Sequence, residues 1–232
     1  MEAGGIAVVM GAGGGIGRAL VERLRQYDGV DRVIGFSRTS SPAIDLLNEA
    51  SLAAAAEWAA TQGTIRLVID ATGFLHDQGR RPEKSWRELD PSHLAKAFAL
   101  NAIGPALIMK HLLPLLPREG KSVFATLSAR VGSIGDNRLG GWYSYRASKA
   151  ALNQLVRTAA IELSRRQPEA ICVALHPGTV DTALSKPFRS GVPDGRLFST
   201  EQSAATLLRV IEELGPEASG GFYAWDGSPI PW

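Results

Sequence analysis

The chain has 232 residues, a length that suits one α/β domain with a sizeable core. Its 25 basic and 23 acidic residues are interspersed without a basic block and give a net charge of +2, which argues against a nucleic-acid partner. The single cysteine, Cys172, excludes a disulfide framework, and no charged leader or apolar stretch of membrane-spanning length is expected, so we predict a reducing, cytoplasmic location without a membrane partner.

The predicted elements alternate along the chain between short apolar runs of strand length and longer segments of helical periodicity. The predicted strands are 6–10, 32–37, 65–70, 122–128, 170–176 and 221–225. The predicted helices are 16–26, 51–60, 91–116, 142–165 and 200–214. This alternation is typical of parallel β-α units rather than of a sandwich or a helical bundle.

A glycine-rich turn, Gly11-Ala12-Gly13-Gly14-Gly15-Ile16-Gly17, follows the first predicted strand. Glycines allow a tight turn and let backbone N–H groups approach a pyrophosphate at a helix N-terminus. The next strand ends in Ser37 and Arg38, at the position where proteins that bind NAD usually carry a carboxylate. A hydroxyl and a guanidinium suit a 2′-phosphate instead. NADP(H) is therefore the preferred cofactor and NAD(H) the alternative, unless Arg38 is simply a surface residue.

Tyr145 and Lys149 lie four residues apart in the predicted helix 142–165 and so share one of its faces. An ammonium held beside a phenol lowers the pKa of the phenol toward neutrality, which would make Tyr145 an acid-base group. The alternative is a surface tyrosine beside a solvated lysine, because this spacing also arises by chance.

Two further features concern access to a site and metal binding. Residues 179–198 are rich in Pro, Gly, Ser and Arg and have no clear period, which predicts either a mobile lid or an ordinary connection. The four histidines lack metal-ligand spacing, so we predict no metal site.

Four motifs in one order resemble the short-chain dehydrogenase/reductase family over nearly the whole chain. They are Gly11-x-x-x-Gly15-Ile16-Gly17, Asn101-Ala102-Ile103-Gly104, Tyr145-x-x-x-Lys149 and Pro177-Gly178-Thr179-Val180-Asp181-Thr182. Residues 128–134 and 140–149 are similar to the branch that contains C-factor and sniffer-type carbonyl reductases. The resemblance implies a single Rossmann-type, doubly wound parallel sheet over residues 1–232. It also implies hydride transfer between a nicotinamide dinucleotide and a carbonyl or alcohol, and a homodimer or homotetramer built from helices 91–116 and 142–165.

The resemblance also implies roles for individual residues. Tyr145 would protonate the carbonyl oxygen, and Lys149 would lower the pKa of Tyr145 while bonding the nicotinamide ribose. Asn101 would hold a water in a proton relay, and Ser128 would orient the substrate oxygen. The cofactor-binding residues would be Gly11, Gly15, Ile16, Gly17, Ser37, Arg38, Asp45, Leu46, Thr72, Gly73, Tyr145, Lys149, Pro177, Gly178, Val180 and Thr182.

The chain departs from the family pattern at three places. Ala129 stands where the family has its catalytic serine, so we choose Ser128, with Ser133 as the alternative. The family's Asn-Asn-Ala-Gly is replaced by Asp70-Ala71-Thr72-Gly73. Only residues 39–44 separate Arg38 from Asp45, so the helix between the second and third strands of the family is expected to be shortened or absent. The first two departures leave a second hypothesis open, an NADP-binding regulatory or signalling protein with little turnover.

Overall fold

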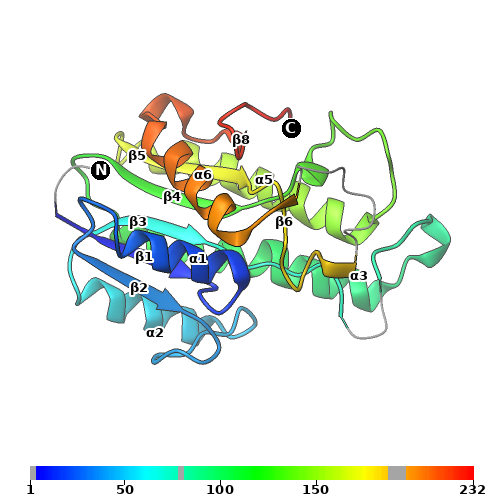
Figure 1. Ribbon diagram of the computed structural model, residues 1–232, viewed down its shortest axis with the longest axis horizontal. Helices are drawn as coiled ribbons and strands as arrows, with labels where there is room; N and C mark the ends of the chain where they lie inside the picture. The colour runs from blue at the N-terminus through cyan, green and yellow to red at the C-terminus, as the bar shows by residue number, and fades with distance from the viewer. Residues whose placement is uncertain (1–3, 78–80, 188–196) are drawn as a thin grey trace.

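A parallel sheet with helices on both faces forms the centre of the molecule (Figure 1). The computed structural model describes residues 4–77, 81–187 and 197–232. The six strands of this sheet run in the order β2-β1-β3-β4-β5-β8, and every neighbouring pair is parallel. They are β1 (Ile6–Met10), β2 (Arg32–Phe36), β3 (Ile65–Asp70), β4 (Ser122–Leu127), β5 (Ala170–His176) and β8 (Phe222–Ala224). The predicted α/β architecture is confirmed.

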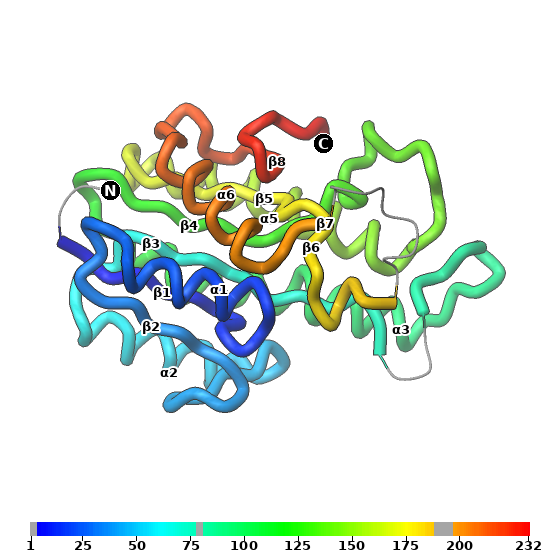
Figure 2. Tube along the Cα trace, viewed as in Figure 1, coloured from blue at the N-terminus to red at the C-terminus, as the bar shows by residue number. Residues whose placement is uncertain are grey.

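The helices divide between the two faces of the sheet. They are α1 (Gly15–Leu24), α2 (Glu49–Ala60), α3 (Pro91–Phe98), α4 (Gly104–Leu112), α5 (Tyr143–Leu163) and α6 (Thr200–Glu213). Figure 2 shows α1 and α6 side by side in front of the sheet, and their buried side chains share one hydrophobic cluster. Side chains from α2, α4 and α5 form the cluster on the other face. The sheet is therefore doubly wound.

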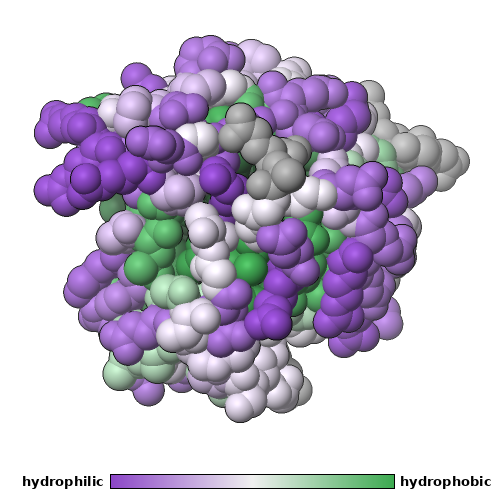
Figure 3. Space-filling view, turned by 90° about the vertical axis from the view of Figure 1, so that its left-hand side faces the viewer, coloured by the Kyte–Doolittle hydropathy of each residue, from purple (hydrophilic) through white to green (hydrophobic). Residues whose placement is uncertain are grey.

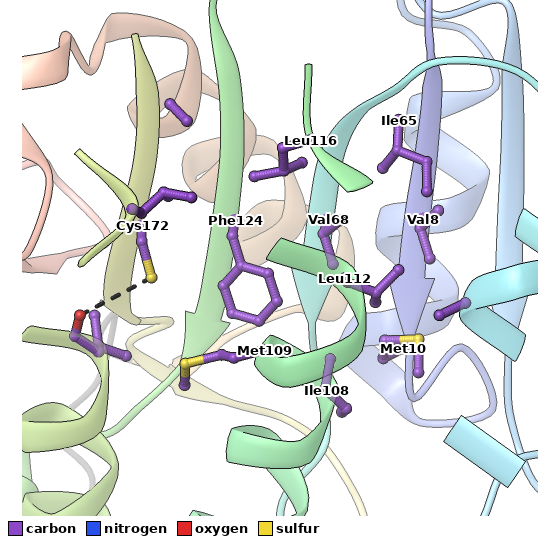
Figure 4. Close-up of a cluster of buried hydrophobic side chains, with 14 of the residues drawn as sticks. Val8, Met10, Ile65, Val68, Ile108, Met109, Leu112, Leu116, Phe124 and Cys172 are labelled. Carbon is purple, nitrogen blue, oxygen red and sulfur yellow. Dashed lines mark hydrogen bonds between the residues drawn. The ribbon is translucent and has the colours of Figure 1, made fainter. Parts of the chain in front are cut away.

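Each central strand contributes side chains to both hydrophobic clusters, because successive side chains of a strand point to opposite faces of the sheet. In β1, Ala7 and Val9 pack toward α1 and α6, whereas Val8 and Met10 pack toward α2 and α4. Figure 4 shows Phe124 of β4 close to Met109 of α4 in this second cluster. Burying one such side chain stabilises the fold by about 1.5–3 kcal/mol.

Cys172 of β5 lies in the same cluster, fully buried, as the sequence predicts for a small hydrophobe. Burial raises the pKa of its thiol to about 12. The thiol is therefore protonated at neutral pH and serves packing.

The connection between β2 and α2, residues 37–48, contains neither a helix nor a strand. The chain passes directly through α2 to β3, which leaves β2 at the edge of the sheet. The family's helix that would lie before Asp45 is therefore absent, as predicted from the short connection of residues 39–44. The loss opens the end of β2, where Ser37 and Arg38 lie, on its outer side.

One continuous helical segment, Pro91–Leu115, includes α3, a π turn (Ala99–Ile103) and α4. The segment has 25 residues, and an 18-residue window within it has a mean hydropathy of 1.3. By length and composition the segment could cross a membrane, so the expectation that no segment reaches membrane-spanning length is wrong. Ile108 and Leu112 are buried against the sheet, and 39% of the apolar window is buried in all, so one side of this segment packs in the core.

Residues 179–198 begin and end in a short parallel pair, β6 (Thr179–Val180) and β7 (Leu197–Phe198). Residues 188–196 of the predicted lid lie outside the described residues. Figure 3 views the molecule from the end at which the strands begin, and hydrophilic surface there surrounds a central hydrophobic area. The predicted site residues lie at the opposite end of the molecule, where the strands of the sheet end.

Candidate active site

The carboxyl ends of the parallel strands meet at one edge of the sheet, on the right in Figure 1. Open α/β sheets bind ligands at this edge. Predicted site residues follow five neighbouring strands there: Gly11 after β1, Ser37 after β2, Thr72 after β3, Ser128 after β4 and Pro177 after β5. The topology therefore gathers residues that are far apart in the sequence.

The glycine turn is tied to the end of β2 and closely packed on itself. The N–H groups of Gly11 and Ala12 donate to the Phe36 carbonyl at 2.8 and 2.9 Å. A Cβ atom at Gly17 would lie 2.2 Å from the Gly11 carbonyl oxygen, so only glycine fits there. The residue before α1 makes no side-chain capping bond to the helix. The first N–H groups of α1 are therefore suited to a phosphate.

Three other predicted cofactor residues surround this turn. A Cβ atom at Gly13 would lie 3.3 Å from Ser37 Cβ, and one at Gly11 would lie 3.1 Å from Thr72 Cγ2. A Cβ atom at Gly15 would lie 3.0 Å from Thr182 Cγ2. Larger residues in the turn would fill the space that these neighbours border. The turn therefore suits a ligand that needs close backbone approach, such as a dinucleotide.

The two residues expected at the adenine differ in their surroundings. Asp45 is exposed, and its carboxylate accepts a hydrogen bond from the N–H of Leu47 at 2.9 Å. Leu46 is partly buried and packs against the hydrophobic core, close to Gly104 of α4. Arg38 is exposed beside the turn. Asp45 and Arg38 are accessible to a ligand, whereas Leu46 mainly supports the fold.

Tyr145 and Lys149 lie on the first two turns of α5. The Lys149 ammonium is buried and donates to the Leu127 carbonyl at 2.7 Å. Burial lowers the pKa of Lys149 to about 8, and the nearby Asp70 carboxylate acts in the opposite direction. Burial also raises the pKa of Tyr145 to about 12. This is opposite to the lowered phenol pKa expected from the sequence, because the loss of solvent around the Tyr145 phenol disfavours the phenolate. Tyr145 is therefore protonated at neutral pH.

Asn101 lies in the π turn, fully buried, and its amide is engaged on both sides. Its Nδ2 donates to the Phe74 carbonyl at 2.7 Å and to Ser148 Oγ at 3.0 Å, while its Oδ1 accepts from the Phe74 N–H at 2.7 Å. Ser148 in turn donates to the Tyr145 carbonyl at 2.9 Å. Asn101 thus connects the loop after β3 to the turn of α5 that carries Tyr145.

Both candidate serines donate their hydroxyl protons to protein acceptors. Ser128 Oγ donates to Asn153 Oδ1 at 2.6 Å, and Ser133 Oγ donates to the Pro231 carbonyl. Both serines are buried. These contacts do not favour Ser128 over Ser133 as the hydrogen-bond donor to a substrate. In this structure both hydroxyls stabilise contacts between separate segments of the chain.

The turn after β5 closes against α6 and β7. The Pro177 carbonyl accepts a hydrogen bond from Ser203 Oγ at 2.9 Å. Gly178 has a φ of +81°, and a Cβ atom there would lie 2.6 Å from the Phe198 ring, so glycine is required. Val180 is buried in β6. This packing holds the turn at the carboxyl edge, with Thr182 next to the glycine turn.

Two buried polar residues were missed by the sequence analysis. The Asp70 carboxylate accepts hydrogen bonds from the Thr72 N–H at 3.0 Å and from Thr126 Oγ1 at 2.7 Å, and burial raises its pKa. Asn153 is the acceptor for Ser128. Asn153 could have been found, because it lies four residues after Lys149 on the same helical face. Asp70 was seen only as a departure from the family.

Comparisons with known proteins identify the family of the chain. Residues 5–193 match the family described as short chain dehydrogenase, and the chain belongs to this family. The C-signal of Myxococcus xanthus is 38% identical over 146 residues, which cover 62% of this chain and 82% of that protein. The 1-hydroxy-2-glutathionyl-2-methyl-3-butene dehydrogenase of Rhodococcus sp. (strain AD45) is 32% identical over 235 residues, which cover 97% and 98%.

Solved structures show the same fold. The NADPH-bound carbonyl reductase from chicken fatty liver has a TM-score of 0.86 at 24% identity, over 100% of this chain and 96% of that chain. The carbonyl reductase Sniffer of D. melanogaster has a TM-score of 0.82 at 22% identity, over 98% and 99%. The family and the likeness to C-factor and sniffer-type proteins, both expected from the sequence, are confirmed.

Proposed function

We propose that the protein is an NADP(H)-dependent oxidoreductase that interconverts a carbonyl compound and an alcohol. This proposal is supported mainly by the position of the loop Asp70–Gly73, which lies next to both the glycine turn and the buried Lys149 ammonium. A Cβ atom at Gly11 would lie 3.0 Å from the Ala71 carbonyl carbon, and one at Gly73 would lie 3.9 Å from Lys149 Nζ. The glycine turn and the buried lysine therefore border the same short loop.

The residues around the turn suit NADP(H). Gly11, Gly15, Ile16 and Gly17 would hold the pyrophosphate at the start of α1, and Ser37 and Arg38 would hold the 2′-phosphate. When bound, the reduced cofactor supplies the hydride. NADPH in the chicken carbonyl reductase and NADP in a short-chain dehydrogenase/reductase from Burkholderia multivorans support this choice. NAD(H) is the alternative cofactor.

Tyr145 would act as the acid in reduction. A phenol with a pKa of about 12 stays protonated at neutral pH and can donate its proton to a carbonyl oxygen as negative charge develops there. The Lys149 ammonium, one helical turn away, would stabilise the phenolate that remains. A proton relay through Asn101 is part of the proposal.

The test is NADPH oxidation over a panel of aldehydes, ketones and quinones, with Tyr145→Phe as the key variant. We expect the variant still to bind NADPH, since the glycine turn is unchanged, and to lose about 10²–10⁴-fold in kcat, the usual contribution of general acid-base catalysis. Turnover that survives in Tyr145→Phe would contradict the mechanism.

A regulatory or signalling protein of the same fold is the second candidate. Ala129 stands at the family's serine position, and both neighbouring serines donate to protein acceptors. Tight NADPH binding without turnover across the panel would favour this candidate over the enzyme.

A further inference from the structure

Helix α5, which carries Tyr145, begins without a capping group of its own. Trp142 precedes the helix with a left-handed φ of 52°, and its side chain makes no capping bond. Gly140 and Gly141 before it also have positive φ values, 63° and 66°. The first turn of α5 contains no acidic residue. Without a cap, the first N–H groups of α5 would lack hydrogen-bond acceptors. The left-handed backbone of Trp142 is also unfavourable for a residue other than glycine.

Glu83, from a segment distant in sequence, supplies the missing contacts. Its carboxylate accepts hydrogen bonds from the Ser144 N–H, at 3.2 Å, and from the Ser144 hydroxyl. Its own carbonyl accepts the N–H of Trp142. The Glu83 side chain is 3% exposed, which is unusual for a glutamate. One buried residue thus caps α5 and also fixes the left-handed residue that precedes it.

We propose that Glu83 is a positioning residue for Tyr145. This inference rests on the proposed function, in which the Tyr145 phenol is the acid. Tyr145 directly follows Ser144, and its ring lies 6.2 Å from the Trp142 ring in an edge-to-face arrangement. Glu83 therefore holds both residues that determine where the first turn of α5 places the phenol.

Lys149 is anchored separately, which makes the position of the first turn important. Its ammonium is bound to the Leu127 carbonyl of β4, so it does not depend on Glu83. A loosened first turn would move the phenol relative to a lysine that stays in place. Misplacement of a catalytic group by about 1 Å can reduce the rate by about 10²-fold.

The experiment compares Glu83→Ala and Glu83→Gln with Glu88→Ala. Glu88 lies on the same segment, is exposed, and accepts from the N–H of Lys84, the residue next to Glu83, at 2.9 Å, so its variant controls for a change in this segment that leaves the Glu83 carboxylate in place. We expect Glu83→Ala to lower kcat by about 10–100-fold while the Kd for NADPH changes less than about threefold. Glu83→Gln keeps one acceptor oxygen and should give an intermediate kcat. Glu88→Ala should match the wild type.

A second readout separates this inference from the proposed function. Amide hydrogen exchange at residues 142–146 should accelerate in Glu83→Ala and less in Glu83→Gln, whether or not a substrate has been found. Wild-type protein without turnover would refute the function and leave this readout intact. Unchanged kcat and exchange in Glu83→Ala would overturn the positioning role. If Glu83→Ala does not fold, Glu83→Gln and Ser144→Ala serve instead, and unaltered kcat and exchange in both would overturn it.

Discussion

At the residue scale, the contact between Ser128 and Asn153 gives the first prediction. Ser128→Ala leaves the Asn153 carbonyl oxygen without its buried donor, so the free energy of unfolding should fall by about 1–3 kcal/mol. If Ser128 mainly joins β4 to α5, kcat should change less than about threefold, since the reacting groups keep their partners. Urea unfolding and NADPH oxidation measure the two effects.

Ser122→Ala is the matched control for this prediction. Ser122 begins β4, the strand that Ser128 directly follows, is fully buried, and its hydroxyl has no hydrogen-bond partner among the described residues. Its replacement removes a hydroxyl without breaking a hydrogen bond, so stability should fall little. A tenfold loss of kcat in Ser128→Ala with unchanged stability would instead restore Ser128 as the substrate donor.

The buried ammonium of Lys149 predicts a dependence of stability on pH. Its pKa is about 8 in the folded protein and 10.5 ordinarily, so between these values the unfolded chain binds more protons. Stability therefore rises with pH across this window. Below pH 8 Lys149 is protonated in both states, so its contribution no longer changes. Relative to Lys149→Met, the cofactor-free protein should gain up to about 3 kcal/mol, at about 1.4 kcal/mol for each pKa unit.

Urea unfolding at pH 7, 8, 9 and 10 measures this difference. Lys84→Met, on an exposed lysine, serves as the control and should follow the wild type at every pH. A constant difference between wild type and Lys149→Met would show that the ammonium is not desolvated as the structure indicates.

The site was predictable where chemistry follows from spacing along one element. Tyr145 and Lys149 share a helical face, and the glycine turn follows a strand, so both were read from the sequence. The surroundings of the candidate serine could not be predicted in this way. Adjacent residues of a strand point to opposite faces, and the hydrogen-bond partner of Ser128 comes from another element, α5. The direction of the Tyr145 pKa shift also depends on burial, which a helical spacing does not report.

At the scale of elements, the connection between β2 and α2 gives a prediction about cofactor choice. Arg38 is exposed there, beside the glycine turn, and no helix crosses the end of β2. Arg38→Leu should weaken NADPH binding by about tenfold or more, because a charge-assisted bond contributes about 1.5–3 kcal/mol, and should leave NADH binding unchanged.

Arg32→Leu is the control, because Arg32 starts the same strand at its opposite end and donates to Gln62 Oε1 at 2.6 Å. Equilibrium titration of cofactor fluorescence measures both affinities. Equal loss of NADPH and NADH binding in Arg38→Leu would contradict recognition of the 2′-phosphate.

The elements themselves were largely predictable, including the helix that is missing before Asp45, because a chain of six residues cannot cross a sheet. The π turn inside 91–115 was not predictable. It surrounds Asn101, whose amide binds the Phe74 backbone and Ser148, and these partners come from other elements. For the same segment, length and composition do not distinguish a core helix from a membrane helix, since both are apolar.

At the scale of the whole molecule, the two long helices carry apolar side chains that the sheet does not cover. Ile103 in the π turn is 55% exposed, and Ile161 of α5 is 48% exposed. The family resemblance implies subunit contacts through these helices. We therefore predict a dimer or tetramer in which this surface is buried.

Ile161→Glu tests the assembly. In an interface formed by two identical surfaces each substitution occurs twice, and a carboxylate without a partner is costly to bury, so the variant should dissociate at concentrations where the wild type is assembled. Leu47→Glu, at a side chain that is 66% exposed on the β2–α2 connection, should leave the assembly intact. Light scattering coupled to size-exclusion chromatography gives the masses. A monomeric wild type, or an Ile161→Glu variant with the wild-type mass, would place subunit contacts elsewhere or exclude them, since the charge would then remain in water.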